Sequence, residues 1–474
     1  MKKASKAFEA IKTISIALLF AMAIIMVFMH FYILQKKNEV ASGASDFRNT
    51  VSLNSDESSV YNSLSPSSLL PSAVAVKNQT GELAAITSSS DYMGEVYSIA
   101  KPDISFMLSN KCIAERLSDS AEFDRALSGE SFIYISYHGN LPGILIYLHT
   151  LDNEYSSASL EIGNLTNSVF LKELIIFQNV KERDAVFALS RSQNGEVFSY
   201  KIASDKQINM HTDDFDIYSE ASAMTAAEFY GINEFKILPS TIVYSLPRSS
   251  YKISISKEDT ELSTNTPLQI ELANMLDINP DKTGSYFDEA LGGTVYMATH
   301  GNLTICNDSI IYSTANNIGG GVSLSFYSGK ATEEPHTMYE IMAIAESIVN
   351  SLNTSDLCSP LLGGEAEPQI TALYRNGDQL VLEYGYFYDN VPISDMEVGV
   401  RLKMSASKLT GFELFPINVK AIKSEQQQCI APAWALSITK GNISEDGLST
   451  IVYKYASIND NDYEAEWIPT QIIG

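Results

Sequence analysis

The feature that most constrains this sequence is an uninterrupted apolar run near its start. Residues 13–34, TISIALLFAMAIIMVFMHFYIL, contain no Asp, Glu, Lys or Arg at any of 22 positions. About 20 such residues in a helix cross the hydrocarbon core of a bilayer, and a buried helix in a soluble protein rarely stays apolar for so long. The run therefore predicts a single transmembrane helix.

The lysines around this segment predict its orientation. Four precede it and two follow it directly, at Lys2, Lys3, Lys6, Lys12, Lys36 and Lys37. Because Lys-rich ends stay on the cytoplasmic side, we expect residues 1–12 inside the cell and the bulk of the chain outside it. A cleaved signal peptide is the alternative, but the small-residue stretch 42–44 lies far beyond the apolar run. We expect an uncleaved, single-pass protein of the cell membrane, in contact with membrane lipid.

The chain is strongly acidic, with a formal net charge of −25 at pH 7. Nearly all of the carboxylates lie beyond the predicted membrane helix. Such a surface repels nucleic acid and anionic polymers at close range. We therefore expect no nucleic-acid partner.

Four cysteines are scattered along the chain, at Cys112, Cys306, Cys358 and Cys429. No pair has the C-x-x-C spacing of a zinc ribbon or a thioredoxin-like motif. Outside the membrane they allow up to two disulfides, in any of three connectivities. We expect small buried hydrophobic residues, or one disulfide at most.

The remaining chain divides by composition. Residues 35–72 form a predicted linker, since 42–72 alone contain eleven serines, a composition typical of a loosely packed stalk. Beyond it we expect three domains, over residues 73–215, 216–335 and 336–474. Many aromatic residues and short alternating runs predict an α+β fold rich in antiparallel sheet.

The first region, 73–215, mixes both kinds of element. An apolar stripe beginning at Met93 predicts a helix, and SDSAEFDRAL predicts a second helix that ends at Gly129. The segment SFIYISYH then predicts a strand. Asn194-Gly195, between AVFALS and EVFSYKI, predicts a β-hairpin.

The next two regions repeat one plan, a helix followed by an antiparallel meander. Thr266-Pro267 predicts a capped helix start in the second region, with strands at TVYMAT, LTIC, SIIYST and GVSLSFYS. In the third region Thr337 and Glu340 form a capping box before a helical apolar stripe. Strands are expected there at QITALYR, QLVLEYGYFY, EVGVRLKM and LTGFELFPINV. A helix covering one face of such a sheet makes an economical α+β domain.

Motifs that could carry chemistry are weak. SISK with Lys282-Thr283-Gly284 resembles the motifs of penicillin-binding transpeptidases, with Ser254 as the nucleophile and Lys257 as its activator. That serine must begin a helix, whereas YKISISKE alternates as a strand does. HTDDFD, residues 211–216, lacks the glycine and the final glutamate of a calcium loop, and residues 319–321 lack the Lys-Ser/Thr of a phosphate loop. We expect no catalytic residues, no metal and no cofactor.

Two small alanines mark a contact face on the predicted membrane helix. Ala17 and Ala21 lie four residues apart and therefore share one face. Small side chains at this spacing let a neighbouring membrane helix approach closely. The pair is our predicted helix-packing face.

An aromatic strand is the second predicted contact site. Tyr384, Tyr386 and Tyr388 alternate onto one face of QLVLEYGYFY, and Phe387 joins the other. We expect one face to lie under the helix of residues 337–353. The tyrosines are expected to build the sheet first, with a partner-binding surface as the second role.

Four segments, in their order, resemble a known family. They are YISYHGNLPGILIYL, FDEALGGTVYMATHGNLTICNDSIIYST, the meander EYGYFYDNVPI…VGVRLKM…GFELFPI, and IAPAWALSI. With the basic N-terminus and single membrane helix, they are similar to the YycH-type regulators and the shorter YycI proteins. These accompany the WalK (YycG) sensor kinase in Gram-positive bacteria. One departure is Asp389-Asn390-Val391-Pro392, where related meanders more often have a glycine-led turn.

The resemblance implies an N-terminal domain followed by two PepSY-like domains, without enzymatic activity. It also implies contact with a WalK-like kinase through the membrane helix and the outer domains, with a YycI-like companion. The predicted function is a noncatalytic, membrane-anchored regulator of a cell-envelope sensor histidine kinase in a two-component system of cell wall homeostasis. The alternative is an extracytoplasmic PepSY-type module that binds a ligand or inhibits a protease independently of a kinase.

Overall fold

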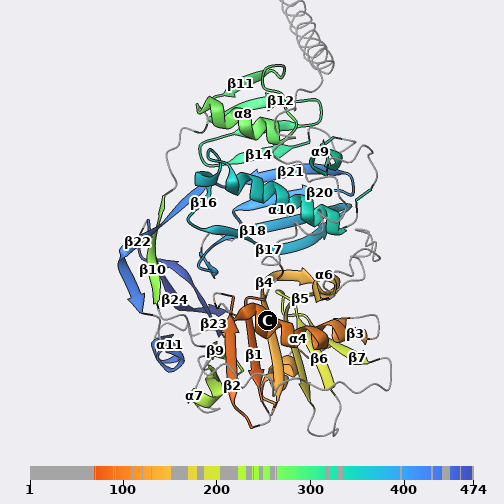
Figure 1. Cartoon of the computed structure of the whole chain (residues 1–474), viewed down its shortest axis with the longest axis vertical. Coiled ribbons are helices and arrows are strands. Elements are labelled where there is room, and N and C mark those ends of the chain that lie inside the picture. Colours follow the sequence, from red (N-terminus) through yellow and green to blue (C-terminus); the bar gives the residue numbers. More distant parts are fainter. Residues whose placement is uncertain are drawn as a thin grey trace, which may run out of the picture.

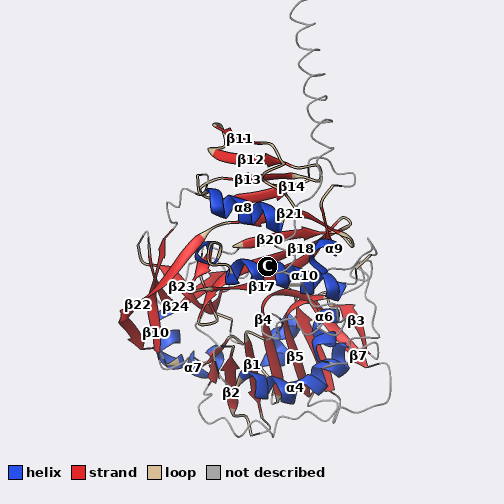
Figure 2. Cartoon of the chain, turned by 45° about the horizontal axis from the view of Figure 1, so that its top comes forward, coloured by secondary structure: helices blue, strands red, loops and turns tan. Residues whose placement is uncertain are grey.

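The computed structural model describes most of residues 69–471, and the longest stretches left out within this range are 151–168, 179–185, 203–222 and 440–448. The fold is mixed α+β and rich in strands, as the sequence predicts (Figure 2). The predicted membrane helix and most of the predicted linker lie outside the described residues. No helix in the described part of the chain is long and apolar enough to cross a membrane.

The first region forms an antiparallel N-terminal sheet in the order β2-β1-β4-β5-β6-β7-β3 (Figure 1). Its strands are β1 (Ala73–Lys77), β2 (Leu83–Thr87), β3 (Cys112–Arg116), β4 (Phe132–Pro142), β5 (Phe170–Gln178), β6 (Val186–Arg191) and β7 (Val197–Ile202). The predicted hairpin joins β6 to β7, and Gly195 has a φ of 80° there. Glycine reaches that conformation without a steric penalty.

Helices cover both faces of the N-terminal sheet. α4 (Met93–Leu108) and α6 (Gly143–Thr150) pack on the face that contains Ile133 and Ile135. α5 (Ala121–Leu127) packs on the opposite face, against Phe132 and Ile175. Alternate residues of one strand thus enter two separate cores, as the period of two requires.

The second and third regions build one antiparallel sheet, which we call the central sheet. Its order is β11-β12-β13-β14-β21-β20-β18-β17. The strands are β11 (Ser285–Asp288), β12 (Gly293–Met297), β13 (Asn302–Ile305), β14 (Ile310–Ser313), β17 (Glu367–Asn376), β18 (Gln379–Tyr388), β20 (Val400–Met404) and β21 (Lys408–Leu414). The last strand of the first meander, β14, pairs with the last strand of the second, β21. The two predicted meanders are therefore halves of a single sheet.

Two helices cover the same face of the central sheet (Figure 1). They are α8 (Thr266–Met275) and α10 (Met338–Thr354). α8 precedes β11–β14 and α10 precedes β17–β21, so the predicted order of helix then meander is present in both halves. The predicted stripe of α10 is buried, with Ile341, Ile344, Ala345, Ile348 and Leu352 each at most 2% exposed.

Three local predictions are corrected. The cap of α8 is Asn265 and not Thr266, since the Asn265 side chain accepts from the Leu268 N–H at 3.3 Å. GVSLSFYS is a two-residue strand, β15 (Val322–Ser323), followed by the helix α9 (Leu324–Ser328). Leu324 and Tyr327 are buried at helical spacing, which explains why α9 forms. β11 has no counterpart among the predicted strands.

A third, five-stranded sheet has the order β16-β22-β10-β24-β23. Its strands are β10 (Ser249–Ser256), β16 (Leu362–Gly364), β22 (Ile417–Gln428), β23 (Ser449–Ser457) and β24 (Asp462–Gln471). The remaining elements are β8 (Ala223–Thr225), β9 (Ile242–Tyr244), β19 (Val391–Pro392), α7 (Ala226–Tyr230), α11 (Pro432–Thr439) and the 3₁₀ helix η5 (Ser359–Leu361). β10 precedes α8 in the chain yet pairs with β22 and β24. The sheets therefore cross the domain boundary predicted at residue 335.

Candidate interaction surface

The predicted aromatic site lies in the core. Tyr384 and Tyr386 are 2% and 1% exposed, on the face of β18 that α10 covers. Burial, followed by the nearby charge of Glu346 in α10, raises the pKa of Tyr384 well above its usual value. The two buried tyrosines offer no surface to a partner, so this part of the predicted partner surface is corrected.

Tyr388 and Phe387 complete the strand. Tyr388 is partly buried, with its ring 5.9 Å from that of Tyr455 in an edge-to-face contact. Phe387 points to the opposite face and is 2% exposed. Its ring meets His138 of β4 at 4.5 Å. The aromatic strand thus joins the central sheet to both of its neighbours.

The face of the central sheet turned away from α8 and α10 carries a row of aligned side chains. Strand register places one residue of each neighbouring strand in this row: Tyr286, Val295, Thr304, Ile311, Glu413, Arg401 and Glu383. We call this the ion-pair face. Residues directly opposite each other on antiparallel strands have neighbouring Cβ atoms, so the row is continuous.

Charged groups at the centre of this face are paired. Arg401 donates to Glu383 Oε1 at 2.8 Å and to Glu413 Oε2 at 2.7 Å. Lys403 donates to Glu413 Oε1 at 2.5 Å, and Tyr374 donates to Glu383 Oε1 at 3.1 Å. Burial opposes ionisation of Glu413, but the hydrogen bonds from Lys403 and Arg401 outweigh it and lower the pKa of this carboxyl. The pairs hold four charges in fixed positions.

This network was missed by sequence reasoning, although a signal exists. The segments LEY, VRLK and FEL alternate apolar and charged residues within strands that were predicted correctly. Such alternation places the charged residues on one face. The register between the strands, which brings opposite charges together, is not written in any one segment.

The N-terminal sheet meets the central sheet at β4. Asn140 pairs with Ala372 of β17 in a parallel bridge, which joins the two sheets into one 17-stranded ladder. The Asn390 side chain donates to the Ser88 carbonyl at 3.1 Å and accepts from Gln369 at 2.7 Å. These contacts bind the two sheets through both backbone and side chains.

The conformation of the turn at Asp389-Asn390 explains why this chain can do without the glycine that related meanders more often have there. Both residues have positive φ, 48° and 60°. This is the conformation of a two-residue type I′ hairpin turn, in which Asn and Asp are tolerated beside Gly. Asn390 therefore adopts the turn that glycine would adopt and adds a side chain that reaches Ser88.

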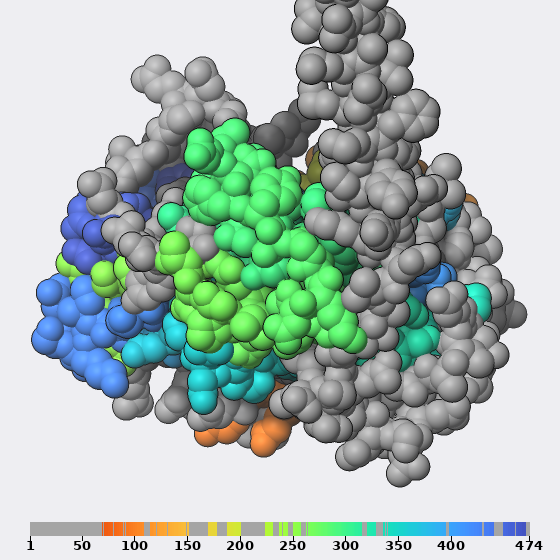
Figure 3. Space-filling model, turned by 90° about the horizontal axis from the view of Figure 1, so that it is seen from above, coloured from red at the N-terminus to blue at the C-terminus, as the bar shows by residue number. Residues whose placement is uncertain are grey.

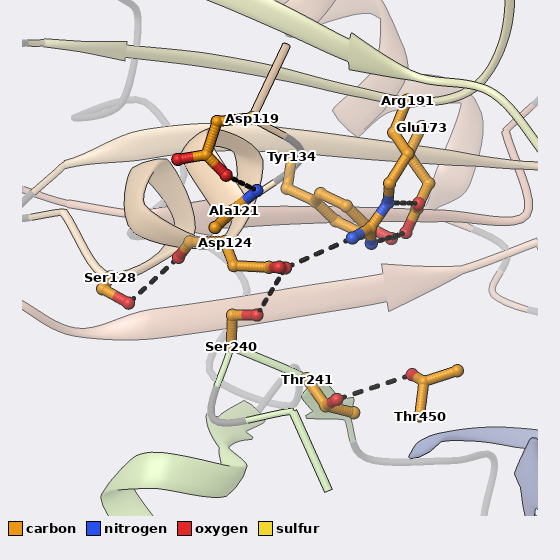
Figure 4. A network of polar contacts seen from close by, with 10 residues as sticks. All are labelled: Asp119, Ala121, Asp124, Ser128, Tyr134, Glu173, Arg191, Ser240, Thr241 and Thr450. Carbon is orange, nitrogen blue, oxygen red and sulfur yellow. Dashed lines mark hydrogen bonds and ion pairs between the residues drawn. The ribbon is translucent and has the colours of Figure 1, made fainter. Parts of the chain in front are cut away.

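A second polar network lies between α5 and the segment before β9 (Figure 4). Arg191 donates through Nε and Nη2 to Glu173, at 2.5 and 3.0 Å, and through Nη1 to Asp124 at 3.2 Å. Tyr134 donates to Glu173 at 2.6 Å, and Ser240 donates to Asp124 at 2.9 Å. Burial alone would raise the pKa of Glu173. The charge and hydrogen bonds of Arg191 outweigh this effect, so the net result is a lowered pKa. The network fixes Ser240 to the N-terminal sheet.

The other residues singled out by sequence give no reactive cluster. Ser254 lies in β10, where it pairs with Lys420 and Asp462, so the predicted strand is confirmed and the serine does not begin a helix. Cys306 and Cys358 are free thiols. The side chains of Cys112 and Cys429 lie outside the described residues, as do Ala17, Ala21, Lys257 and residues 211–216. Within the described residues no group of three or more His, Cys, Asp or Glu could hold a metal ion.

Comparisons with known proteins found no match. No protein-family model, no curated protein and no solved structure is similar to this chain.

Proposed function

We propose that this protein is a noncatalytic regulator, anchored in the cell membrane, that modulates a WalK-like sensor histidine kinase. Residues 13–34 are the proposed anchor, with the described domains on the outer side of the membrane. The kinase is contacted by the membrane helix and by the outer domains, with a YycI-like protein as companion. The halves of the central sheet correspond to the two PepSY-like units in this proposal.

The observation that carries the proposal is the duplicated unit of the central sheet. α8 precedes β11–β14, and α10 precedes β17–β21, in the order that the resemblance implies. The charge-free run of 22 residues supports the same architecture. The His138–Phe387 ring contact and the Asn140–Ala372 bridge join the N-terminal sheet to the central sheet, and ion pairs such as Arg401–Glu383 fix side chains within the central sheet. A surface held in this way suits recognition of another protein.

Kinase output in living cells tests the proposal. Deleting the gene should change both phosphorylation of the cognate response regulator and transcription of its target genes. The full chain should restore both, and it should co-purify with the kinase from detergent-solubilised membranes. An unchanged phosphorylation level after deletion would refute the proposal. It would favour the alternative, a module that binds a ligand or inhibits a protease by itself.

The predicted helix-packing face gives a sharper test. Replacing Ala17 and Ala21 by Leu keeps the segment able to insert, because Leu is at least as favourable as Ala in a membrane. The larger side chains should nevertheless prevent close helix packing. We expect loss of co-purification and of regulation, whereas Leu18→Val should behave as the native chain. A double Leu variant that still regulates would place the contact on the outer domains alone.

The hypothesis of a penicillin-binding transpeptidase, which we do not favour, can be tested separately. Fluorescent penicillin labels the catalytic serine of a penicillin-binding transpeptidase covalently. We expect no labelling of the purified full chain, with a known penicillin-binding protein as the positive control. Labelling that is lost in Ser254→Ala would overturn the noncatalytic assignment.

A further inference from the structure

The strand β11 is an open edge of the central sheet. It pairs with β12 on one side, and no other described strand pairs with it on the other (Figure 1). In Figure 3, the part of the chain around residues 280–300 faces the viewer from above. An edge of this kind presents backbone groups on which another chain can extend the sheet.

The hydrogen-bond pattern identifies the groups that point outward. The Met297 N–H donates to the Gly284 carbonyl at 3.2 Å, so Gly284 and Met297 form a hydrogen-bonded pair next to the first strand pair. Such pairs alternate along an antiparallel ladder. Tyr286 and Asp288 therefore bond to β12, while the N–H and C=O groups of Ser285 and Phe287 point to the open edge.

Side chains on this edge are apolar and exposed on both faces of the sheet. Phe287 is 56% exposed on the face of α8, and Tyr286 is 47% exposed on the ion-pair face. Leu291, in the turn that follows, is 56% exposed. A strand added beside β11 would cover these three side chains as well as pair with the backbone.

The charge around the edge selects the occupant. Residues 277–313 contain five carboxylates and one lysine. Asp288 and Asp308 both lie close enough to Cys306 that, after burial, their charges help to raise the pKa of its thiol. A second copy of this chain would bring the same acidic edge against its own, and the like charges would repel. A basic partner segment would be attracted.

We propose that β11 is a docking edge for an extended, basic segment of a partner protein, which adds to the central sheet as a further antiparallel or parallel strand. Its alternate side chains cover Tyr286 and Phe287, and its Lys or Arg residues lie beside Asp288 and Glu289. The inference rests on the proposed function in one respect, namely that this chain binds a partner protein. The chemistry of the edge specifies the segment whichever protein carries it.

A synthetic probe tests the edge directly. A short, end-capped peptide that alternates Val and Lys is added at millimolar concentration to the purified full chain in neutral detergent. One matched peptide carries N-methyl groups on alternate amides, which keeps the charge but removes the strand donors. A second replaces Lys by Glu. We expect the first peptide to bind about tenfold more tightly than either control, because the controls lose net hydrogen bonds or opposite charges.

Hydrogen exchange locates the binding site. The basic peptide should slow exchange of the Ser285 and Phe287 amides. Phe287→Pro removes the outward donor but spares the bonds to β12, since proline is tolerated on the open side of an edge strand. It should weaken binding about tenfold. Phe287→Val keeps the donor and an apolar side chain, so it should weaken binding by clearly less than the proline variant. Slow exchange at Tyr286 in the proline variant would confirm that β11 remains paired with β12.

Three results would overturn the proposal. The first is equal binding of the basic peptide and its N-methylated form, which would indicate charge attraction without strand addition. The second is absence of protection at Ser285 and Phe287. The third is self-association of the chain that Phe287→Pro abolishes, which would make a second copy the occupant. None of these results would affect the test of kinase regulation, since the probe is a synthetic peptide.

Discussion

Replacing Gly139 by Ala tests whether a direct backbone contact holds the N-terminal sheet against the central sheet. Gly139 precedes Asn140, which pairs with Ala372 of β17. A Cβ built on Gly139 would overlap the carbonyl group of Thr371 and lie 2.7 Å from its Cα, whereas ordinary contacts begin at 3.4 Å. The obstructing atoms are all backbone, so no side-chain rotation relieves the overlap.

The expected cost follows from what the chain must give up. An overpacked core typically costs about 1–3 kcal/mol. Keeping the two sheets together in Gly139→Ala would cost more than this, because both obstructing groups are backbone and no side chain can move away. Separating them instead loses the contact between His138 and Phe387, worth about 0.5–1.5 kcal/mol. It also loses the Asn390–Ser88 hydrogen bond, worth about 1 kcal/mol. With the lost Asn140–Ala372 bridge, we expect a loss of about 3 kcal/mol in the free energy of unfolding.

Urea unfolding of the full chain in detergent measures this loss, and hydrogen exchange over β4 and β17 shows where the structure loosens. Gly94→Ala is the matched control, since a Cβ on Gly94 of α4 meets nothing within 4 Å. That variant should be neutral or stabilised by less than about 1 kcal/mol. A Gly139→Ala variant with native stability and unchanged exchange at β17 would refute the proposed backbone contact.

Three further predictions concern the contacts between and within the sheets. Burial, and then the charge of Lys172, lowers the pKa of His138 from 6.5 to about 3. The neutral ring therefore makes its full contribution to the free energy of unfolding above pH 6.5, and this contribution is lost as the pH falls from 6.5 towards 3. Urea titrations should show that the free energy of unfolding falls by about 2 kcal/mol between pH 7.5 and pH 5. The His138→Gln variant should lack this part of the pH dependence. Asn390→Gly keeps the turn and should cost only the hydrogen bond to Ser88, about 1 kcal/mol, whereas Asn390→Ala should cost about 1 kcal/mol more through its positive φ; equal losses would refute the role of the turn. Arg401→Met leaves two carboxylates without their shared partner and should cost about 1–2 kcal/mol, after allowance for partial exposure; a stability equal to the native chain would show that the ion pairs contribute nothing net.

Sequence patterns succeed here where one segment carries its own signal. The stripe of α10 repeats at helical spacing, and all five predicted positions are buried. The hairpin at Gly195 has both alternating flanks and a turn residue that tolerates positive φ. Local spacing decides these elements, so no knowledge of distant partners is needed.

The failures involve partners that are distant in the sequence. SYFD of β11 is four residues long and has no alternation of its own, because it is a strand only by pairing with β12. Tyr384 and Tyr386 build the sheet as predicted, but their face of β18 is the one that α10 covers, so the second predicted role as a partner surface fails. β10 alternates clearly, yet its partners β22 and β24 lie more than 150 residues further along the chain. Pairing at such separation depends on the whole fold and not on local propensity.

The two ends of the central sheet differ in a way that bears on the docking edge. At one end β17 meets Asn140 of β4, and the missing side chain of Gly139 lets the two backbones come this close. At the other end β11 has no described neighbour beyond β12. Natural edge strands are commonly protected by Lys, by Pro, by a bulge or by a covering segment.

None of these four protections is present among the described residues at β11, which is protected only by its shortness and by the carboxylate of Asp288. Its sequence, Ser-Tyr-Phe-Asp, has neither Lys nor Pro, and it pairs with β12 without a register shift. Tyr286 and Phe287 are exposed and lie outside the core, so polar residues at these two positions would not reduce core packing. Acidic groups around the edge repel another copy of the chain but attract a basic strand. An edge that excludes its own copies and leaves its backbone available is suited to a different, basic partner, whereas a merely unprotected edge would pair with any strand.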